Sequence, residues 1–298
     1  MKAKGFILTT LAVSFAMSGW AQSNLLNAKT PEDIGVRTEE QIAADNDEPL
    51  EYGYVDDRDV LWSKTVWEKI DLDERLNFPY YYPTDTIGID ASRRSLYQVL
   101  MKNIRDGKIE HVYADSYFTE KRTLNDIQAA IKKVDTLDFG YEQLNAGEEV
   151  SAEYIDIRDL TAADIEEYRV KGVWYFDKRQ GEMKYRLLGI APVAPDVNFI
   201  DEGGADDYLV ELFWVWFPSA REVLHESKVF NNRNSALPIS YDHLLNSRRF
   251  SAVIYREDNV YGDRDVAEYI QENALMQLLE SDRVKTRIRD FEQDMWSY

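Results

Sequence analysis

The sequence of 298 residues contains no cysteine. This absence excludes a disulfide framework and any thiolate metal site. It also excludes a lipid-modified cysteine at the start of a mature exported chain. If the chain is exported, we therefore expect it to diffuse freely or to be held by a partner.

Histidine is almost as scarce, with only His111, His225 and His243, which lie far apart. None has the spacing of metal ligands. The sequence also lacks a G-x-S-x-G elbow, a Walker A loop, an H-E-x-x-H motif and a G-x-G-x-x-G motif. The acidic stretch 196–204 resembles a calcium loop, but Ile200 occupies a ligand position. The sequence predicts no catalytic residue, no metal site and no cofactor.

Long apolar runs are absent after the first residues of the chain. Lys2 and Lys4 precede an apolar run from Phe6 to Met17, and the small residue Ala21 follows it. This order is typical of a cleavable secretory signal, and the run is shorter than the roughly 20 residues of a membrane span. Residues 1–21 are predicted to be a signal peptide, so we expect an exported chain without direct membrane insertion.

Basic residues are outnumbered, with 35 Lys and Arg against 55 Asp and Glu, which gives a net charge of −20. Nucleic acids and anionic membrane surfaces both require a basic footprint, so neither is an expected partner. From Pro31 to Asp59 there are eleven acidic residues against Arg37 and Arg58, and the apolar residues of the segment 22–58 follow no period. This segment is predicted to be an extended acidic arm. It is either a flexible tail or an arm that orders on a neighbouring subunit.

Large aromatic residues are abundant, and they concentrate in one stretch of the chain. Trp62, Val66 and Ile70 repeat at intervals of four, which predicts a short helix over 59–71. Pro79 and Pro83 enclose three tyrosines, a run predicted to be extended because residues before proline avoid the helical region. Aromatic side chains are favoured both in cores and as interface anchors, so each can serve either role. The candidate interface residues are Tyr52, Tyr54, Trp62, Trp67, Tyr80, Tyr81, Tyr82, Trp214 and Trp216.

The periodicities predict two structured units. Residues 59–135 form an N-terminal α+β unit, with a helix over 92–105 capped by Ser92, a strand over 109–113 and a helix over 124–134. Residues 136–170 are predicted to be a linker with a short helix near 162–168.

Residues 171–298 form the C-terminal α+β unit. It contains a hairpin over 173–190, a strand over 208–217 that is apolar on both faces, short helices over 219–225 and 241–248, and a strand over 252–256. Its last element is a helix over 265–291, which lies across its own sheet or packs partly on a partner. The predicted fold class is α+β, with small antiparallel sheets, flanking helices, the acidic arm and a long C-terminal helix.

Four motifs carry a resemblance to a known family. They are DDRDVLWSKTVWEKIDLDERLNFPYYYP (56–83), RRSLYQVL (93–100), GKIEHVYADSYF (107–118) and FWVWFPSAREVL (213–224). They resemble the N subunit of the gliding-motility and type IX (Por) secretion machinery, the GldN/PorN family. The resemblance extends from about residue 54 to the C-terminal helix.

The resemblance implies a non-catalytic, periplasmic structural protein that forms a ring. Its implied partners are an outer-membrane lipoprotein, the K subunit, and the periplasmic domain of the inner-membrane M subunit. It would be associated with the outer membrane through the lipoprotein. Abundant carboxylates and aromatic residues leave an alternative open, a periplasmic carbohydrate-binding protein or glycoside hydrolase.

Overall fold

The structure is a computed structural model that describes residue 30 and residues 48–85, 93–147, 151–199, 209–229, 239–271 and 273–296. The chain divides into two units, Met1–Glu48 and Pro49–Tyr298, and the elements below belong to the second. The predicted signal peptide (1–21) and most of the predicted acidic arm (22–58) lie outside the described residues.

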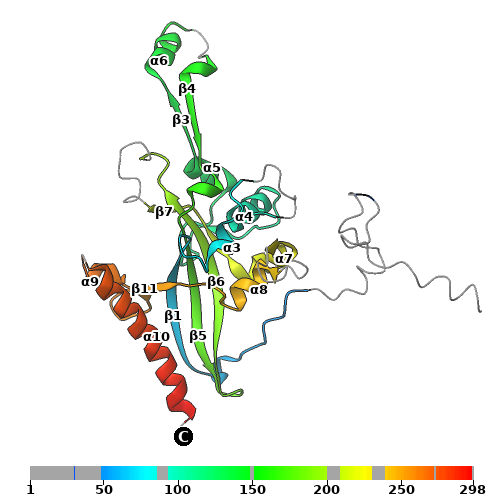
Figure 1. The fold of residues 1–298 in the computed structure, drawn as a ribbon, viewed down its shortest axis with the longest axis vertical. Helices are drawn as coiled ribbons and strands as arrows, with labels where there is room; N and C mark the ends of the chain where they lie inside the picture. Colours follow the sequence, from blue (N-terminus) through cyan, green and yellow to red (C-terminus); the bar gives the residue numbers. More distant parts are fainter. Residues whose placement is uncertain are drawn as a thin grey trace, which may run out of the picture. The chain divides into compact units, whose positions relative to one another are not determined.

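A single twisted sheet is the centre of the Pro49–Tyr298 unit (Figure 1). Its strands lie in the order β11-β1-β5-β6-β8-β2, with β7 also paired to β6, and all pairs are antiparallel. In chain order these strands are β1 (Val60–Asp71), β2 (Val112–Tyr113), β5 (Glu167–Asp177), β6 (Glu182–Pro195), β7 (Leu209–Glu211), β8 (Trp214–Trp216) and β11 (Val253–Glu257). The two stretches that the periodicities separate, 59–135 and 171–298, therefore contribute strands to the same sheet.

The segment 59–71 is a strand, which corrects the helix predicted there. A spacing of four residues is close to one helical turn and is also twice the strand repeat, so Trp62, Val66 and Ile70 also share one face of β1. Lys64 and Glu68 occupy the two positions between them on that face. Because both residues are charged, the sequence does not show the alternation of apolar and polar residues that is typical of a strand. Both charges form ion pairs in the fold, Lys64 with Glu257 and Asp258, and Glu68 with Arg248.

Other strand predictions hold, with changed limits. The predicted hairpin is confirmed and longer, because β5 pairs with β6 along the whole length of β5, from Glu167↔Val193 to Asp177↔Glu182. The predicted strand over 208–217 is divided into β7 and β8, which are separated by Leu212 and Phe213. Every residue from Leu212 to Val215 is fully buried, so the expectation of a segment apolar on both faces is met there. Tyr208 lies outside the described residues.

Helices and short elements connect the strands. The helices are α3 (Phe78–Tyr81), α4 (Leu96–Arg105), α5 (Leu124–Ile131), α7 (Phe217–Glu226) and α8 (Tyr241–Asn246). The short elements are the 3-10 turns η2 (Asp57–Asp59) and η4 (Ala162–Asp164) and a two-stranded sheet of β9 (Lys228–Val229) and β10 (Ile239–Ser240). The α+β class, with antiparallel sheets and helices, is confirmed.

The predicted cap of the helix after the tyrosine run is corrected. Helix α4 begins after Ser95, whose hydroxyl accepts from the Gln98 backbone while the Gln98 side chain accepts from the Ser95 backbone. This reciprocal pair satisfies two amide groups that the first helical turn leaves free. Ser92, the predicted cap, lies outside the described residues. Gly107 follows the helix with a φ of +72°, as expected for a helix C-terminus.

The tyrosine run is one helical turn, where the sequence predicts extended chain. Pro79 lies in the first turn of α3, a position at which no amide hydrogen is needed. The extended prediction holds only for Tyr82, the residue directly before Pro83, with φ −90° and ψ 146°. Tyr80 consequently points into the core, while Tyr82 is exposed.

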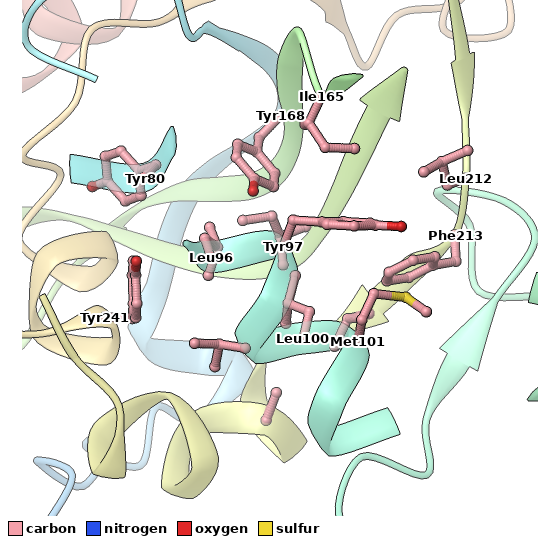
Figure 2. Close-up of a cluster of buried hydrophobic side chains, with 14 of the residues drawn as sticks. Tyr80, Leu96, Tyr97, Leu100, Met101, Ile165, Tyr168, Leu212, Phe213 and Tyr241 are labelled. Carbon is pink, nitrogen blue, oxygen red and sulfur yellow. The ribbon is translucent and has the colours of Figure 1, made fainter. Parts of the chain in front are cut away.

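The main hydrophobic core lies between the sheet and helices α3, α4, α7 and α8 (Figure 2). Helix α4 contributes Leu96, Tyr97, Leu100 and Met101 to its centre. Rings from distant segments surround them. Those labelled in Figure 2 are Tyr80, Tyr168, Phe213 and Tyr241.

A two-stranded hairpin projects from the main sheet (Figure 1). It consists of β3 (Lys132–Thr136) and β4 (Ile155–Asp159), with α6 (Asp138–Asn145) and η3 (Ala152–Tyr154) at its tip. The sequence predicts a helix through residue 134 and a linker over 136–170. The structure corrects both predictions, because these residues form most of the hairpin. Helix α5 ends at Ile131, and the β-branched residues Val134 and Thr136 continue as a strand. The predicted helix over 162–168 is reduced to η4, because β5 begins at Glu167.

The long C-terminal helix is confirmed, although it is interrupted once. Helix α9 (Val266–Tyr269) ends at Ile270, and α10 (Ala274–Trp296) begins after Asn273, whose side chain accepts from the Met276 backbone. Helix α10 contacts β11, and Val284 and Ile288 pack against Val66 and Ile254. Within the described residues, no helix is both long and apolar enough to cross a membrane.

Candidate interaction surfaces

Three of the nine candidate interface residues are core residues. Trp67, Tyr80 and Trp214 are at most 1% exposed. Tyr80 packs against Tyr241 and Phe250. In this conformation their own chain encloses these three rings.

The Trp67 ring lies in a cluster on the sheet face opposite Trp62. It packs with Ala191 and Trp214, and the ammonium of Lys171 lies 4.7 Å from its ring centroid. Half-burial desolvates the Lys171 ammonium and lowers its pKa. The Lys171 Nζ donates to the backbone oxygen of Ser116 at 2.9 Å, which fixes the ammonium over the ring. Because Lys171 and its neighbours fill this cluster, it offers no open surface.

Tyr52 anchors the end of the predicted arm on its own chain. Two guanidinium groups lie over its ring, that of Arg221 at 4.1 Å and that of Arg186 at 4.6 Å from the ring centroid. Its hydroxyl donates to Asn246 at 2.7 Å, and burial raises the pKa of Tyr52 to about 12. Cations over an aromatic face stabilise such contacts, so this ring is a strong local anchor.

The backbone on both sides of Tyr52 is held by arginines as well. Arg221 donates to the oxygen of Leu50 and Arg186 to that of Gly53. Arg179 donates to the oxygen of Tyr54, whose own side chain is 80% exposed. The segment 50–55 is therefore a strap, bound to its own chain through one ring and three carbonyl oxygens.

We expect Tyr52→Ala to release this strap. The substitution removes two cation–π contacts and the Asn246 hydrogen bond, which together stabilise the bound strap by about 1–2 kcal/mol. Limited proteolysis should then cleave near Gly53 roughly tenfold faster than in the parent chain. Tyr54→Ala is the matched control, because that ring is exposed, and it should leave the cleavage rate unchanged. Equal rates in both variants would show that Tyr52 does not hold the strap.

The other candidate rings are partly or largely exposed. Trp62 stacks on Phe291 of α10 with 4.8 Å between ring centroids, and Trp216 packs edge-on against Phe118 at 4.8 Å. The Tyr81 hydroxyl donates to the backbone oxygen of Ala163 at 3.0 Å. Tyr82 is exposed beside it, with its ring edge-on to Tyr81. Of the nine candidates, Tyr54 and Tyr82 are the ones that expose most of their surface.

Within the described residues, one group of exposed apolar side chains is not singled out by the sequence. The β3–β4 hairpin is a two-faced ribbon, because Val134 pairs with Ile157 on one face and Lys133 with Arg158 on the other. On the charged face, Lys133 forms an ion pair with Asp135, and Arg158 forms one with Asp156. The exposed apolar side chains of the ribbon and of its tip are Val134, Leu137, Phe139, Tyr141, Leu144 and Ile157. We call this set the hairpin tip.

The first turns of α10 form a second uncovered apolar surface. Leu275, Leu278 and Leu279 are each about half exposed or more. Their spacing of three and four places them on one side of the helix, away from the side that buries Val284 and Ile288. We call these three residues the α10 leucines. A periodicity search finds them, but it cannot separate them from a core stripe.

Clusters of charged side chains are the other feature that could form a functional site, such as a metal site. Among the residues that the structure describes, no group of three or more His, Asp or Glu side chains could hold a metal ion.

The fold and these surfaces define an α+β protein with uncovered apolar faces, a combination typical of proteins that work by contacting other proteins. The chain belongs to the family described as "Gliding motility associated protein GldN", whose sequence profile matches residues 55–297. It is therefore a component of the gliding motility and type IX secretion machinery. The proteins of this family are structural components of that machinery. A search of curated proteins finds no match to the chain.

Proposed function

We propose that the chain is a non-catalytic ring subunit of the type IX secretion and gliding machinery. It is exported through the signal peptide 1–21 and functions in the periplasm. An outer-membrane lipoprotein, the K subunit, holds it at the outer membrane, and the periplasmic domain of the inner-membrane M subunit contacts it. Family membership supports this proposal.

One structural observation supports the proposal in addition to the family membership. The hairpin tip exposes six large apolar side chains, Val134 and Ile157 on the two strands and the other four at and in helix α6. A two-stranded hairpin is only marginally stable alone in water and needs packing on a further surface. Apolar patches of this kind mark interaction sites. A subunit of a large assembly has such surfaces, and the acidic arm 22–58 and Tyr82 would add to them.

A size measurement tests the proposal. We expect the mature chain to copurify with the K lipoprotein in a complex many times larger than one 34.7 kDa chain. Light scattering coupled to size exclusion, with and without the lipoprotein, gives the mass. A monodisperse monomer that the lipoprotein does not change would contradict the proposal. Binding of that monomer to glycans would then favour a carbohydrate-binding protein.

A further inference from the structure

The strap 50–55 is bound through groups that many peptides share. Three of its backbone oxygens accept from arginines, and every peptide has such oxygens. Its side chains contribute little besides Tyr52, because Leu50 and Tyr54 are each 80% exposed. The Tyr52 hydroxyl donates to Asn246 at 2.7 Å, a contact that a phenylalanine cannot make. An extended segment with one tyrosine therefore meets the requirements of this site. We call the three donors, Arg179, Arg186 and Arg221, the arginine seat.

Contacts outside the strap hold the seat in shape. Arg221 of α7 donates to both carboxylate oxygens of Asp242 in α8, at 2.8 and 3.1 Å. Asn246 donates to the same carboxylate at 2.8 Å, which orients the acceptor of the tyrosine hydroxyl. Arg179 forms an ion pair with Asp59 at 3.1 Å. None of these contacts involves the strap, so the seat should stay formed when the strap leaves, and a preorganised site binds a peptide at a lower entropic cost.

A cavity of about 450 Å³ lies alongside the strap. Its lining includes the strap residues 51–55 and, from the β5–β6 hairpin, Arg179, Lys184 and Arg186. Two members of the seat thus border open space while the strap is bound. An incoming segment has access to them before the strap has left.

The balance of contacts indicates which kind of occupant can replace the strap. Each copy of this chain carries one strap and one seat, so an exchange of straps between copies adds no contact. A tyrosine-bearing segment of a different protein fills the seat without using a strap. Such a segment is therefore the occupant that gains free energy from the exchange.

We propose that the arginine seat is a peptide-binding site, which the strap closes in its own chain and which an extended, tyrosine-bearing segment of a different protein occupies. The incoming tyrosine replaces Tyr52, and the backbone oxygens of the segment accept from the seat. The strap is a tethered competitor with a high effective concentration, so it excludes peptides that bind weakly. Seat and strap belong to one chain, so the exchange does not depend on the ring function proposed above.

A labelled peptide with the strap sequence 49–57, PLEYGYVDD, is the probe, and fluorescence anisotropy measures its binding to the mature chain. We expect the Tyr52→Ala chain to bind it at least tenfold more tightly than the parent chain, because the weakened strap no longer competes. A peptide with alanine in place of the tyrosine that corresponds to Tyr52 should bind at least tenfold more weakly. The same change at the position of Tyr54 should have no effect. Equal affinities of the parent and Tyr52→Ala chains would overturn the proposal.

A matched pair of substitutions locates the bound peptide. In the Tyr52→Ala chain, Arg186→Gln removes one cation of the seat and should weaken peptide binding at least fivefold. Lys178→Gln removes the same charge from an exposed position of the β5–β6 turn and should leave the affinity unchanged. Equal effects of the two substitutions would show attraction by charge alone and would contradict a built site.

A reporter on the strap tests the exchange in a chain that keeps Tyr52. Because the sequence has no cysteine, Tyr54→Cys accepts a single fluorophore at an exposed position of the strap. Unlabelled peptide should lower the anisotropy of this fluorophore, since the displaced strap moves freely. Peptide binding without that change would place the peptide elsewhere and overturn the proposal.

Competition distinguishes a different protein from a second copy. The unlabelled parent chain should not displace the labelled peptide from the Tyr52→Ala chain, because its own strap is bound. Displacement would identify a second copy as the occupant and overturn the proposal.

Discussion

Trp67→Ala should lower the free energy of unfolding by about 3–5 kcal/mol, as expected for truncation of a buried aromatic ring. Trp67 is 1% exposed and lies on β1, which is paired on both sides, with β5 and with β11. Its removal leaves a cavity beside Ala191 and Trp214 and takes away the ring over which Lys171 lies. Chemical denaturation of the isolated chain measures the change.

Two controls make this result specific. Trp67→Phe keeps an aromatic ring, and it removes an indole nitrogen that has no hydrogen-bond partner within the described residues, so it should cost much less. Trp216→Ala truncates the same side chain at a half-buried position and should also cost less. A near-neutral Trp67→Ala would mean that this ring is not part of the core of the isolated chain.

Glu68→Ala should destabilise the chain by about 3 kcal/mol, the lower end of the range for a buried ion pair that loses one partner. Both Glu68 oxygens accept from Arg248 at 2.8 Å, and the Tyr185 hydroxyl donates to the same carboxylate. Desolvation lowers the pKa of Arg248, but the hydrogen bonds and the charge of Glu68 outweigh it and raise that pKa. Without Glu68, a largely desolvated guanidinium remains over the Tyr185 ring. About a quarter of the Arg248 side chain meets water, which moderates the cost.

A double variant separates the pair from the packing around it. Glu68→Met combined with Arg248→Met removes both charges, so no unpaired ion remains, and the loss should be clearly smaller than for Glu68→Ala. The exposed pair Lys108–Glu226 is the surface control, and Glu226→Ala should change stability by under about 1 kcal/mol. Equal losses in Glu68→Ala and Glu226→Ala would show that the Glu68 pair is not buried in solution.

Local patterns predicted several elements correctly. The α4 helix follows from its apolar spacing and from Gly107 at its end, and the β5–β6 hairpin follows from alternation on either side of a turn. These elements depend on contacts close in the sequence, so the sequence carries their signal. The four motifs also predicted the family that the profile match confirms.

The sequence-based predictions are wrong where contacts between residues distant in the sequence determine the local structure. Lys64 and Glu68 occupy inward positions of β1 because partners roughly 180 residues away neutralise them. The sequence of the segment 59–71 does not show these partners, so the spacing of its apolar residues fits a helix. The hairpin of β3 and β4 was missed because its apolar residues are uncovered, so one face shows no core pattern and the other is charged.

The sequence alone therefore determined the α+β class, the long C-terminal helix and the family, since each depends on local periodicity or on continuous motifs. Only the tertiary structure decided which aromatic residues are available to a partner. Trp67, Tyr80 and Trp214 are buried by segments far along the chain, whereas the hairpin tip and the α10 leucines remain in water. Burial is a property of the whole packed chain, and no residue's identity encodes it by itself.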